Sequence, residues 1–475
     1  MPKNQDQGVA MMPATELLSL YAKKKLSPVE AVTAALDRIV LHNAAYNAFC
    51  LIDGKGALAA ARASEKRWQR GEPVGPLDGV PTGIKDIMLS KGWPTLRGSK
   101  AIDPKSQKWE EDAPAVARLR EAGAVFLGKT TTPELGWKGI TDSPLTGVTR
   151  NPWNPAMTPG GSSGGSAAAL AAGMGTLMTA SDGGGSIRMP GAFTGIFGIK
   201  PSFGRVPAYP ASPFGTLSHV GPMARTVGDA ALMLTVMAEP DHRDWYALPT
   251  DRMDYTKGLN RGVKGLKIGY SPDLGHAKVD PEIAAAVAAG AKLFDRLGAR
   301  VEEVDPGQGS SIFKESHDFF TVHWNAGAAN VLATFTAKQR AGMDPGLQEI
   351  AAIGERYTAL QYLAAVKRRE ELGGVMQRFH LKYDLLLTPA LPLPAFEAGR
   401  ETPAKSGMKR WTEWTPFTYP FNLTRQPAAV VPCGLTKAGL PVALQLVGPM
   451  YGDAMVLQAA RAYEKARPFA MPVLA

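Results

Sequence analysis

Cysteine and histidine are scarce in this chain, and their scarcity excludes several kinds of function. The 475 residues include two cysteines and seven histidines. Cys50 and Cys433 cannot form a disulfide framework, and no HExxH pair or other metal-ligand spacing occurs. We therefore expect no metal and no cofactor, and a reducing cytoplasm as the location.

Long apolar runs are missing as well. The run at residues 230–238 is among the longest, whereas a membrane-spanning helix needs roughly 20 apolar residues. The opening MPKNQDQGVAMMPATE has no basic segment followed by an apolar one, so no secretory signal is expected. With 45% hydrophobic and 20% charged residues, the composition is that of a globular protein with a large core.

A net charge of +10 is the one bulk property that could indicate nucleic-acid binding. The basic residues are scattered, however, and the two dense groups, at 23–25 and 367–369, both fall in helical patterns. Solvated helix faces explain such groups. We expect neither a nucleic acid nor a membrane as a partner.

An alternation of helix, glycine and strand indicates an α/β protein. Residues 112–122, Gly123 and 124–128 follow this order, and residues 281–297, Gly298 and 299–304 repeat it. Further patterns predict helices at 15–24, 27–39, 56–70 and 453–466, strands at 383–388 and 442–447, and a helix-rich wall at 313–379. Segments 239–264 and 391–410, rich in Pro, Gly or charge, are candidate insertions near a site mouth.

Two clusters of glycine and serine, PGGSSGGS and DGGGSIRMP, are the most unusual feature of the chain. A flexible linker would be polar on both sides. Here residues 166–172 between them predict a small-residue helix, and residues 176–179 predict a short buried strand. Each cluster therefore lies at the end of a structured element, where catalytic backbone is often found.

Three polar residues in apolar or glycine-rich surroundings, Lys85, Ser162 and Ser186, suggest a nucleophilic mechanism without histidine. Burial lowers the pKa of a lysine, so that its amine can act as a neutral base and activate a serine. Successive glycine N–H groups before Ser186 could stabilise an oxyanion.

The same blocks carry a family resemblance. GVPTGIKD, PGGSSGGS, DGGGSIRMP and GAFTGIFGIKPSFGRVP, with Ser162 and Ser186 24 residues apart, resemble the amidase signature family. DAPAVARLREAGAVFLGKTTTPELGW, TGVTRNPWNP and PFNLTRQPAAVVPCG are also similar to it, so the resemblance covers most of the chain. It implies a single large α/β domain over residues 1–475, a twisted mixed β-sheet covered by helices, with a core at about 70–235.

The resemblance also implies residue roles. Ser186 would be the acyl-accepting nucleophile, Lys85 the general base, and Ser162 a bridging serine after a cis peptide at Gly161. The remaining implied residues are an oxyanion hole from the amides of Gly183, Gly184, Gly185 and Ser186, and supporting residues Ser163, Ser181, Asp182 and Arg188.

Some assignments stay open at this point. Arg188 either supports the loop together with Asp182 or meets a substrate carboxylate. Gly183 stands where the family often has a bulkier residue, which would loosen the loop or open room for substrate. The aromatic and thioether side chains either line an acyl or aryl pocket or fill the core; the candidates are Trp137, Met157, Trp411, Trp414, Tyr419 and Phe421.

The function that follows is hydrolysis of a small-molecule carboxylic amide to an acid and ammonia or an amine, through an acyl-enzyme. Carbamates, aryl anilides and esters are alternative substrates of the same core. A component of a tRNA-dependent amidotransferase is a further alternative, although Arg188-Met189-Pro190 departs from the Arg-Gln-Pro of that branch. A non-enzymatic binding protein is disfavoured because all three polar residues are intact. Fold analogy suggests a homodimer, and the sequence does not name the substrate.

Overall fold

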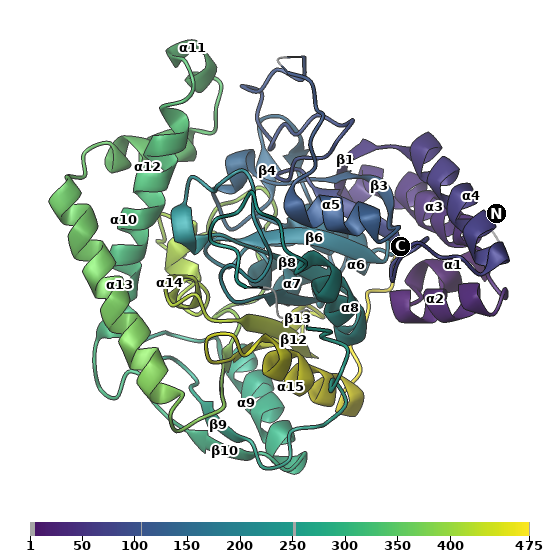
Figure 1. The fold of residues 1–475 in the computed structure, drawn as a ribbon. Helices are drawn as coiled ribbons and strands as arrows, with labels where there is room; N and C mark the ends of the chain where they lie inside the picture. Colours follow the sequence, from purple (N-terminus) through teal and green to yellow (C-terminus); the bar gives the residue numbers. More distant parts are fainter. Residues whose placement is uncertain (1–4, 106, 250–252, 475) are drawn as a thin grey trace.

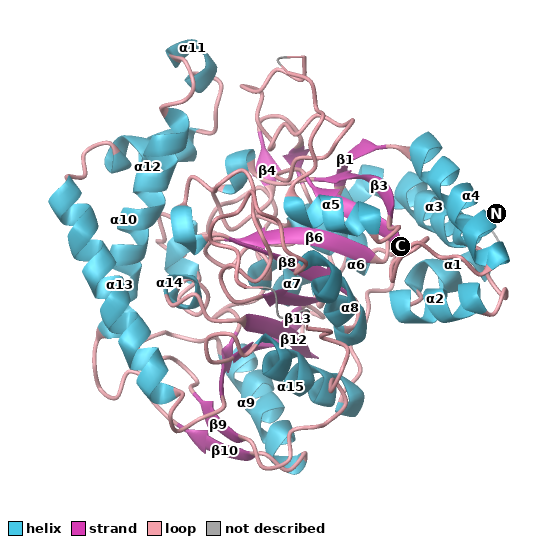
Figure 2. Ribbon diagram, in the orientation of Figure 1, coloured by secondary structure: helices cyan, strands magenta, loops and turns pink. Residues whose placement is uncertain are grey.

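The computed structural model describes residues 5–105, 107–249 and 253–474, which form an α/β fold around one mixed sheet of eleven strands (Figures 1 and 2). The strands lie in the order β1-β3-β2-β6-β8-β7-β12-β13-β11-β9-β10. Their bounds are β1 Phe49–Ile52, β2 Pro81–Lys85, β3 Val125–Thr130, β6 Leu177–Asp182, β7 Phe197–Lys200, β8 His219–Ala224, β9 Lys267–Tyr270, β10 Arg300–Glu303, β11 Leu385–Pro389, β12 Ala428–Leu435 and β13 Pro441–Val447. A separate pair joins β4 Asp142–Ser143 to β5 Gly147–Val148.

Side-chain alternation along the central strands divides the core between the two faces of the sheet. On β13, Val442, Leu444 and Leu446 belong to the hydrophobic cluster beneath α8, α9 and α15. Ala443 and Val447 face the opposite cluster. Both faces are therefore covered, which explains why β13 is apolar except for Gln445.

Helices cover the sheet as the alternation of elements predicts (Figure 2). Helices α5, α8, α9 and α15 lie on one face, and α3, α6 and α7 contact the other. Their bounds are α1 Gln5–Met11, α2 Ala14–Ala22, α3 Pro28–Tyr46, α4 Gly54–Arg70, α5 Pro114–Glu121, α6 Gly164–Ala171, α7 Arg188–Thr194, α8 Val227–Met237, α9 Pro281–Arg296, α10 Ile312–Leu332, α11 Ala337–Arg340, α12 Pro345–Gly354, α13 Ala359–Phe379, α14 Pro420–Leu423 and α15 Asp453–Ala466, with short 3-10 turns at Glu134–Gly136, Gly215–Leu217 and Trp411–Trp414. Within the described part of the chain, none of these helices has the length and apolar character needed to cross a bilayer.

The predicted helical wall is α10 to α13, which stands at the left of the molecule in Figure 1. Residues 250–252 of the first candidate insertion lie outside the described residues. Residues 243–246 of the same segment line a hollow together with Phe203 and His219. That this segment and residues 391–410 are insertions at the site mouth stays a prediction.

Parallel pairing of β2 with β6 brings their carboxyl ends to one edge of the sheet. Thr82 pairs with Leu177 and Gly83 with Met178. The backbone N–H of Lys85, the last residue of β2, donates to the Thr179 hydroxyl at 2.9 Å. This register places the side chain of Lys85 beside the end of β6.

The first glycine and serine cluster, PGGSSGGS, leads into the tightly packed helix α6, as the apolar residues 166–172 after it predict. Every residue of α6 is buried. At Gly165 an added Cβ would lie 2.4 Å from the backbone nitrogen of Thr131 and 2.7 Å from the carbonyl oxygen of Ala48. Glycine is therefore required there by close approach of backbone to backbone, and not by flexibility.

We expect Gly165→Ala to destabilise the protein by about 1–3 kcal/mol, because the methyl group overlaps backbone atoms that cannot move freely. Thermal or denaturant unfolding measures the change. Gly228→Ala in α8 is the matched control, since an added Cβ there meets no atom within 4 Å. That control should be neutral or stabilise by up to about 1 kcal/mol. Equal stability of the two variants would contradict the packing described.

Candidate active site

A buried lysine amine lies among three serine hydroxyls at the edge where β2 and β6 end. Lys85 Nζ donates to Ser162 Oγ at 2.7 Å, to Ser163 Oγ at 2.9 Å and to Ser181 Oγ at 2.9 Å. The lysine side chain has no solvent exposure. Burial lowers its pKa to about 7, although the charge of Asp182 opposes that shift. These three donations are those of the ammonium form. The neutral amine has two N–H donors and one lone pair, and a hydroxyl that donates to that lone pair can give up its proton to it.

The four serines lie in two stretches of the chain, 162–163 and 181–186. Ser162 follows a cis peptide at Gly161, and Ser163 precedes α6. Ser181 is the next-to-last residue of β6, and Ser186 lies in the loop from β6 to α7. The backbone N–H of Ser163 donates to the carbonyl of Ser186 at 3.2 Å, which joins the two clusters. Ser162 and Ser186 therefore open on the same cavity.

The glycine loop before Ser186 presents fewer free amides than the sequence predicts. The N–H of Gly185 donates to Asp182 Oδ1 at 2.7 Å, and the carbonyl of Gly184 accepts from the Thr418 hydroxyl at 2.6 Å. Both polar groups of that peptide unit are thus bound within the protein, so we correct the prediction that Gly185 donates to an oxyanion. No described residue accepts from the amides of Gly183, Gly184 or Ser186, which remain candidate donors.

A side chain larger than hydrogen at position 183 would press against the neighbouring aromatic residues. An added Cβ would lie 3.0 Å from the indole ring of Trp324. Trp324 in turn stacks on Phe214 with ring centroids 4.0 Å apart. An aromatic wall from α10 thus fills the space that the glycine leaves.

Asp182 and Arg188 form a fully buried ion pair behind the loop. Burial alone would raise the pKa of Asp182, but the guanidinium of Arg188 at 2.9 Å outweighs it and holds that pKa well below its usual value. Arg188 also donates to the Thr418 carbonyl, to Gln445 Oε1 at 2.8 Å and to Asn422 Oδ1 at 2.6 Å.

All five N–H groups of the Arg188 guanidinium therefore have partners within the protein. Arg188 supports the loop, and it has no donor left for a substrate carboxylate.

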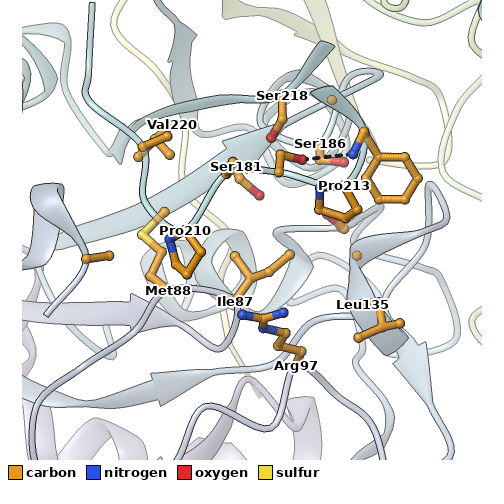
Figure 3. Close-up of a pocket in the computed structure, with 18 of the residues that line it drawn as sticks. Ile87, Met88, Arg97, Leu135, Ser181, Ser186, Pro210, Pro213, Ser218 and Val220 are labelled. Atoms are coloured by element: carbon orange, nitrogen blue, oxygen red, sulfur yellow. Dashed lines mark hydrogen bonds between the residues drawn. The ribbon is translucent and has the colours of Figure 1, made fainter. Parts of the chain in front are cut away.

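The cavity at Ser186 is mostly apolar (Figure 3). The described residues that line it come from eight stretches of the chain: the loop after β2, the start of α5, the turn around Leu135, Ser162, the end of β6 with the loop after it, the segment 207–214, residues 218–220 and helix α10. They are Ile87, Met88, Arg97, Ala113, Ala115, Leu135, Gly136, Ser162, Ser181, Gly183, Ser186, Pro207, Ala208, Tyr209, Pro210, Ala211, Ser212, Pro213, Phe214, Ser218, Val220, Trp324 and Val331.

None of the six candidates for the pocket lines the cavity, which corrects the prediction that they form it; Trp411 and Phe421 are buried, at 2% and 0% exposure. Trp137 and Trp414 are fully buried, and Tyr419 stacks on Phe320 with centroids 4.8 Å apart. Met157 bridges to Glu397 through its backbone. These large side chains fill the core behind the cavity wall, the alternative that the sequence left open.

Sequence reasoning missed several residues of the site. Arg97 lines the cavity and was not predicted, whereas Trp324, which also lines it, belongs to the predicted helix-rich wall at 313–379. Thr179 binds the backbone of Lys85, and Thr418 and Asn422 hold the glycine loop. Of these residues, Asn422 lies in a block that resembles the family, PFNLTRQP, and that block is the sequence feature that could have identified it. Among the described residues, no group of three or more His, Cys, Asp or Glu side chains could hold a metal ion.

We expect Asp182→Ala to destabilise the protein by about 3–5 kcal/mol, because it leaves the buried guanidinium of Arg188 without its counter-ion. Chemical unfolding measures the loss. Glu72→Ala is the control: its partner Arg70 is exposed, with 60% of its side chain accessible, and the change should cost less than about 1 kcal/mol. Similar losses in the two variants would contradict the role assigned to the buried pair.

Comparison with known proteins connects this geometry to a family. The Amidase family model matches residues 30–457. An acylamidase of Rhodococcus erythropolis is 36% identical over 471 residues, with 98% of this chain and 97% of that protein covered. A glutamyl-tRNA(Gln) amidotransferase component from Myxococcus xanthus (strain DK1622) is 37% identical over 478 residues, covering 96% of this chain and 97% of that protein.

A solved structure indicates the same family as these sequence relatives. A bacterial aryl acylamidase of the amidase signature family superposes with a TM-score of 0.89 at 32% identity, over 96% of each chain. The range that the family model matches contains all eleven strands of the sheet and both serine clusters. The chain therefore belongs to the amidase signature family and is a hydrolase that acts on the C–N bond of amides.

Proposed function

We propose that the protein hydrolyses a small-molecule amide through an acyl-enzyme on Ser186, with Lys85 as the base and Ser162 as the proton relay. The observation that carries this proposal is the 2.7 Å hydrogen bond from the buried, solvent-free amine of Lys85 to Ser162. A lysine with a pKa of about 7 is partly neutral at neutral pH and can draw a proton from the Ser162 hydroxyl.

The chemical steps follow from this arrangement. Ser162 takes the proton of Ser186 Oγ as that oxygen attacks the amide carbonyl, and the proton of Ser162 moves to Lys85. The amides of Gly183, Gly184 and Ser186 are the candidate donors to the oxyanion. The C–N bond then breaks, and Ser162 returns a proton to the leaving amine. Water cleaves the acyl-enzyme by the same relay in reverse, which releases the acid and restores Ser186.

The cavity supports substrates with an apolar or aromatic part. Its lining includes Ile87, Leu135 and Val331, together with the stacked Phe214 and Trp324. Aryl anilides therefore fit better than simple aliphatic amides, in keeping with the acylamidase and aryl acylamidase named among the similar proteins. Carbamates and esters of similar shape are alternative substrates of the same core.

A second candidate is a component of an amidotransferase, because similar proteins of 34–37% identity carry that name. Amide hydrolysis by the purified single chain would argue against dependence on a partner. A homodimer and a cytoplasmic location stay predictions.

Replacement of Ser186 by Ala should lower kcat/KM for an anilide by at least about 10³-fold, because the attacking oxygen is removed. Stopped assays of aniline release measure the change. Ser218→Ala is the matched control, since Ser218 lines the same cavity outside the relay, and it should change activity by about twofold at most. A fluorophosphonate should add its mass to Ser186 in the native protein. Undiminished turnover by Ser186→Ala would overturn the proposal.

The pH dependence tests the base. Lys85 must lose its proton to act, so kcat/KM should rise with pH through about 7 and then level off. Lys85→Arg keeps a positive charge at every pH of the experiment and should be inactive throughout. A flat profile from acid to mildly alkaline pH, or an active Lys85→Arg variant, would contradict the assignment of Lys85.

A further inference from the structure

Arg97 is the only residue with a formal charge among the described residues that line the Ser186 cavity. It lies on the loop after β2, and in Figure 3 it stands on the opposite side of the cavity from Ser186. Its guanidinium makes no hydrogen bond or ion pair with any residue that the structure describes. A partly buried guanidinium whose five donors have no partner among the described residues is available to bind a ligand in place of water.

The charge of Arg97 is not cancelled by its surroundings. Asp86 is the acid that acts on it, opposing the lowering of its pKa by burial. The carboxylate of Asp86 already pairs with the buried amine of Lys129 at 3.3 Å. It also accepts from the backbone amides of Leu96 and Gly98, each at 3.3 Å. Asp86 and Lys129 neutralise each other, so one positive charge remains at this end of the cavity.

The loop holds Arg97 in a fixed position. Its backbone is left-handed, with φ of 53°, which is uncommon for a side chain of this kind. The Asp86 carboxylate binds the amides on both sides of it, and its own carbonyl accepts from Leu135 at 2.7 Å. Lys129 secures the same loop through the Met88 carbonyl at 2.9 Å and the Thr95 hydroxyl. An unusual backbone conformation enforced from several sides is typical of functional positions.

The two arginines near the site thus differ in what they can bind. Arg188 has a protein partner for every donor, whereas Arg97 has none among the described residues. A carboxylate matches the planar fork of a guanidinium with two parallel hydrogen bonds. Between Arg97 and Ser186 the cavity wall is apolar, with Ile87 and Leu135 among its residues, which suits a hydrocarbon spacer.

We propose that Arg97 is a specificity-determining residue, and that the preferred substrate is an amide whose other end is a carboxylate bound by Arg97. This inference rests on the proposed function, since it concerns the same cavity. It adds a substrate class: amides that join an apolar or aromatic amine or acid to a chain ending in a carboxylate.

The test compares matched substrates in matched variants. The substrates are the mono-4-nitroanilides of succinic, glutaric and adipic acids, each beside a neutral analogue in which an acetyl group replaces the terminal carboxylate. The wild-type protein should prefer the anionic member of at least one pair. In Arg97→Gln the ratio of kcat/KM for the anionic over the neutral substrate should fall by about 10- to 100-fold. Arg97→Lys keeps the positive charge but cannot form the two parallel hydrogen bonds of a guanidinium, so it should restore part of that ratio.

Arg62→Gln is the charge-matched control. Arg62 is exposed on α4, so its loss removes one positive charge from the protein without touching the cavity, and the ratio should stay at the wild-type value. Circular dichroism and thermal unfolding check that each variant is folded. A ratio that is unchanged in Arg97→Gln, or an equal loss for both substrates, would overturn the proposal.

A binding experiment separates this inference from the proposed mechanism. In Ser186→Ala, calorimetry measures the Kd of the best anionic anilide without turnover. The added change Arg97→Gln should weaken that binding by about 10-fold or more, while the neutral analogue binds equally to both proteins. Loss of this difference would refute the carboxylate site even if Ser186 proves to be the nucleophile. Retention of it would support the site even if the nucleophile lies elsewhere.

Discussion

The site depends on one interaction, the burial of the Lys85 amine among the hydroxyls of Ser162, Ser163 and Ser181. A charged ammonium in this position would lack water, and burial therefore lowers its pKa to about 7. The fold supplies the position through the parallel pairing of β2 with β6, and it keeps Asp182, whose charge raises the pKa of Lys85, paired with Arg188. A free carboxylate at that point would stabilise the charged lysine and remove the base.

The two arginines near the site differ in role because the protein binds all the donors of one and not those of the other. Arg188 is saturated by Asp182, Asn422, Gln445 and a carbonyl, and so it fixes the loop that carries Ser186. Arg97 is held by its backbone, while its side chain lies in the cavity and is bound by none of the residues that the structure describes. Whether a charged group is structural or binds a ligand is decided here by the number of donors that the protein itself satisfies.

The sequence identified what is encoded locally. Composition and the alternation of helices and strands predicted the α/β fold, and the motif blocks marked Lys85, Ser162 and Ser186, which the structure brings to one cavity edge. The direction of the Gly184–Gly185 peptide could not be predicted, because it depends on Thr418 and Asp182 binding its two ends. The cavity lining could not be predicted either, because it is assembled from eight separate stretches of the chain, and Arg97 lies in it on a left-handed backbone that the sequence does not reveal.

The central claim is that the Lys85 amine loses its proton near neutral pH, so that a large share of it is neutral there. Its most direct test is an NMR titration of the protein with carbon-13 at the lysine Cε position, with the Lys85 signal identified by its absence in Lys85→Arg. The account predicts a titration midpoint near 7, several units below that of exposed lysines. A Lys85 signal that stays in the charged form above pH 9, as for a solvated lysine, would contradict it.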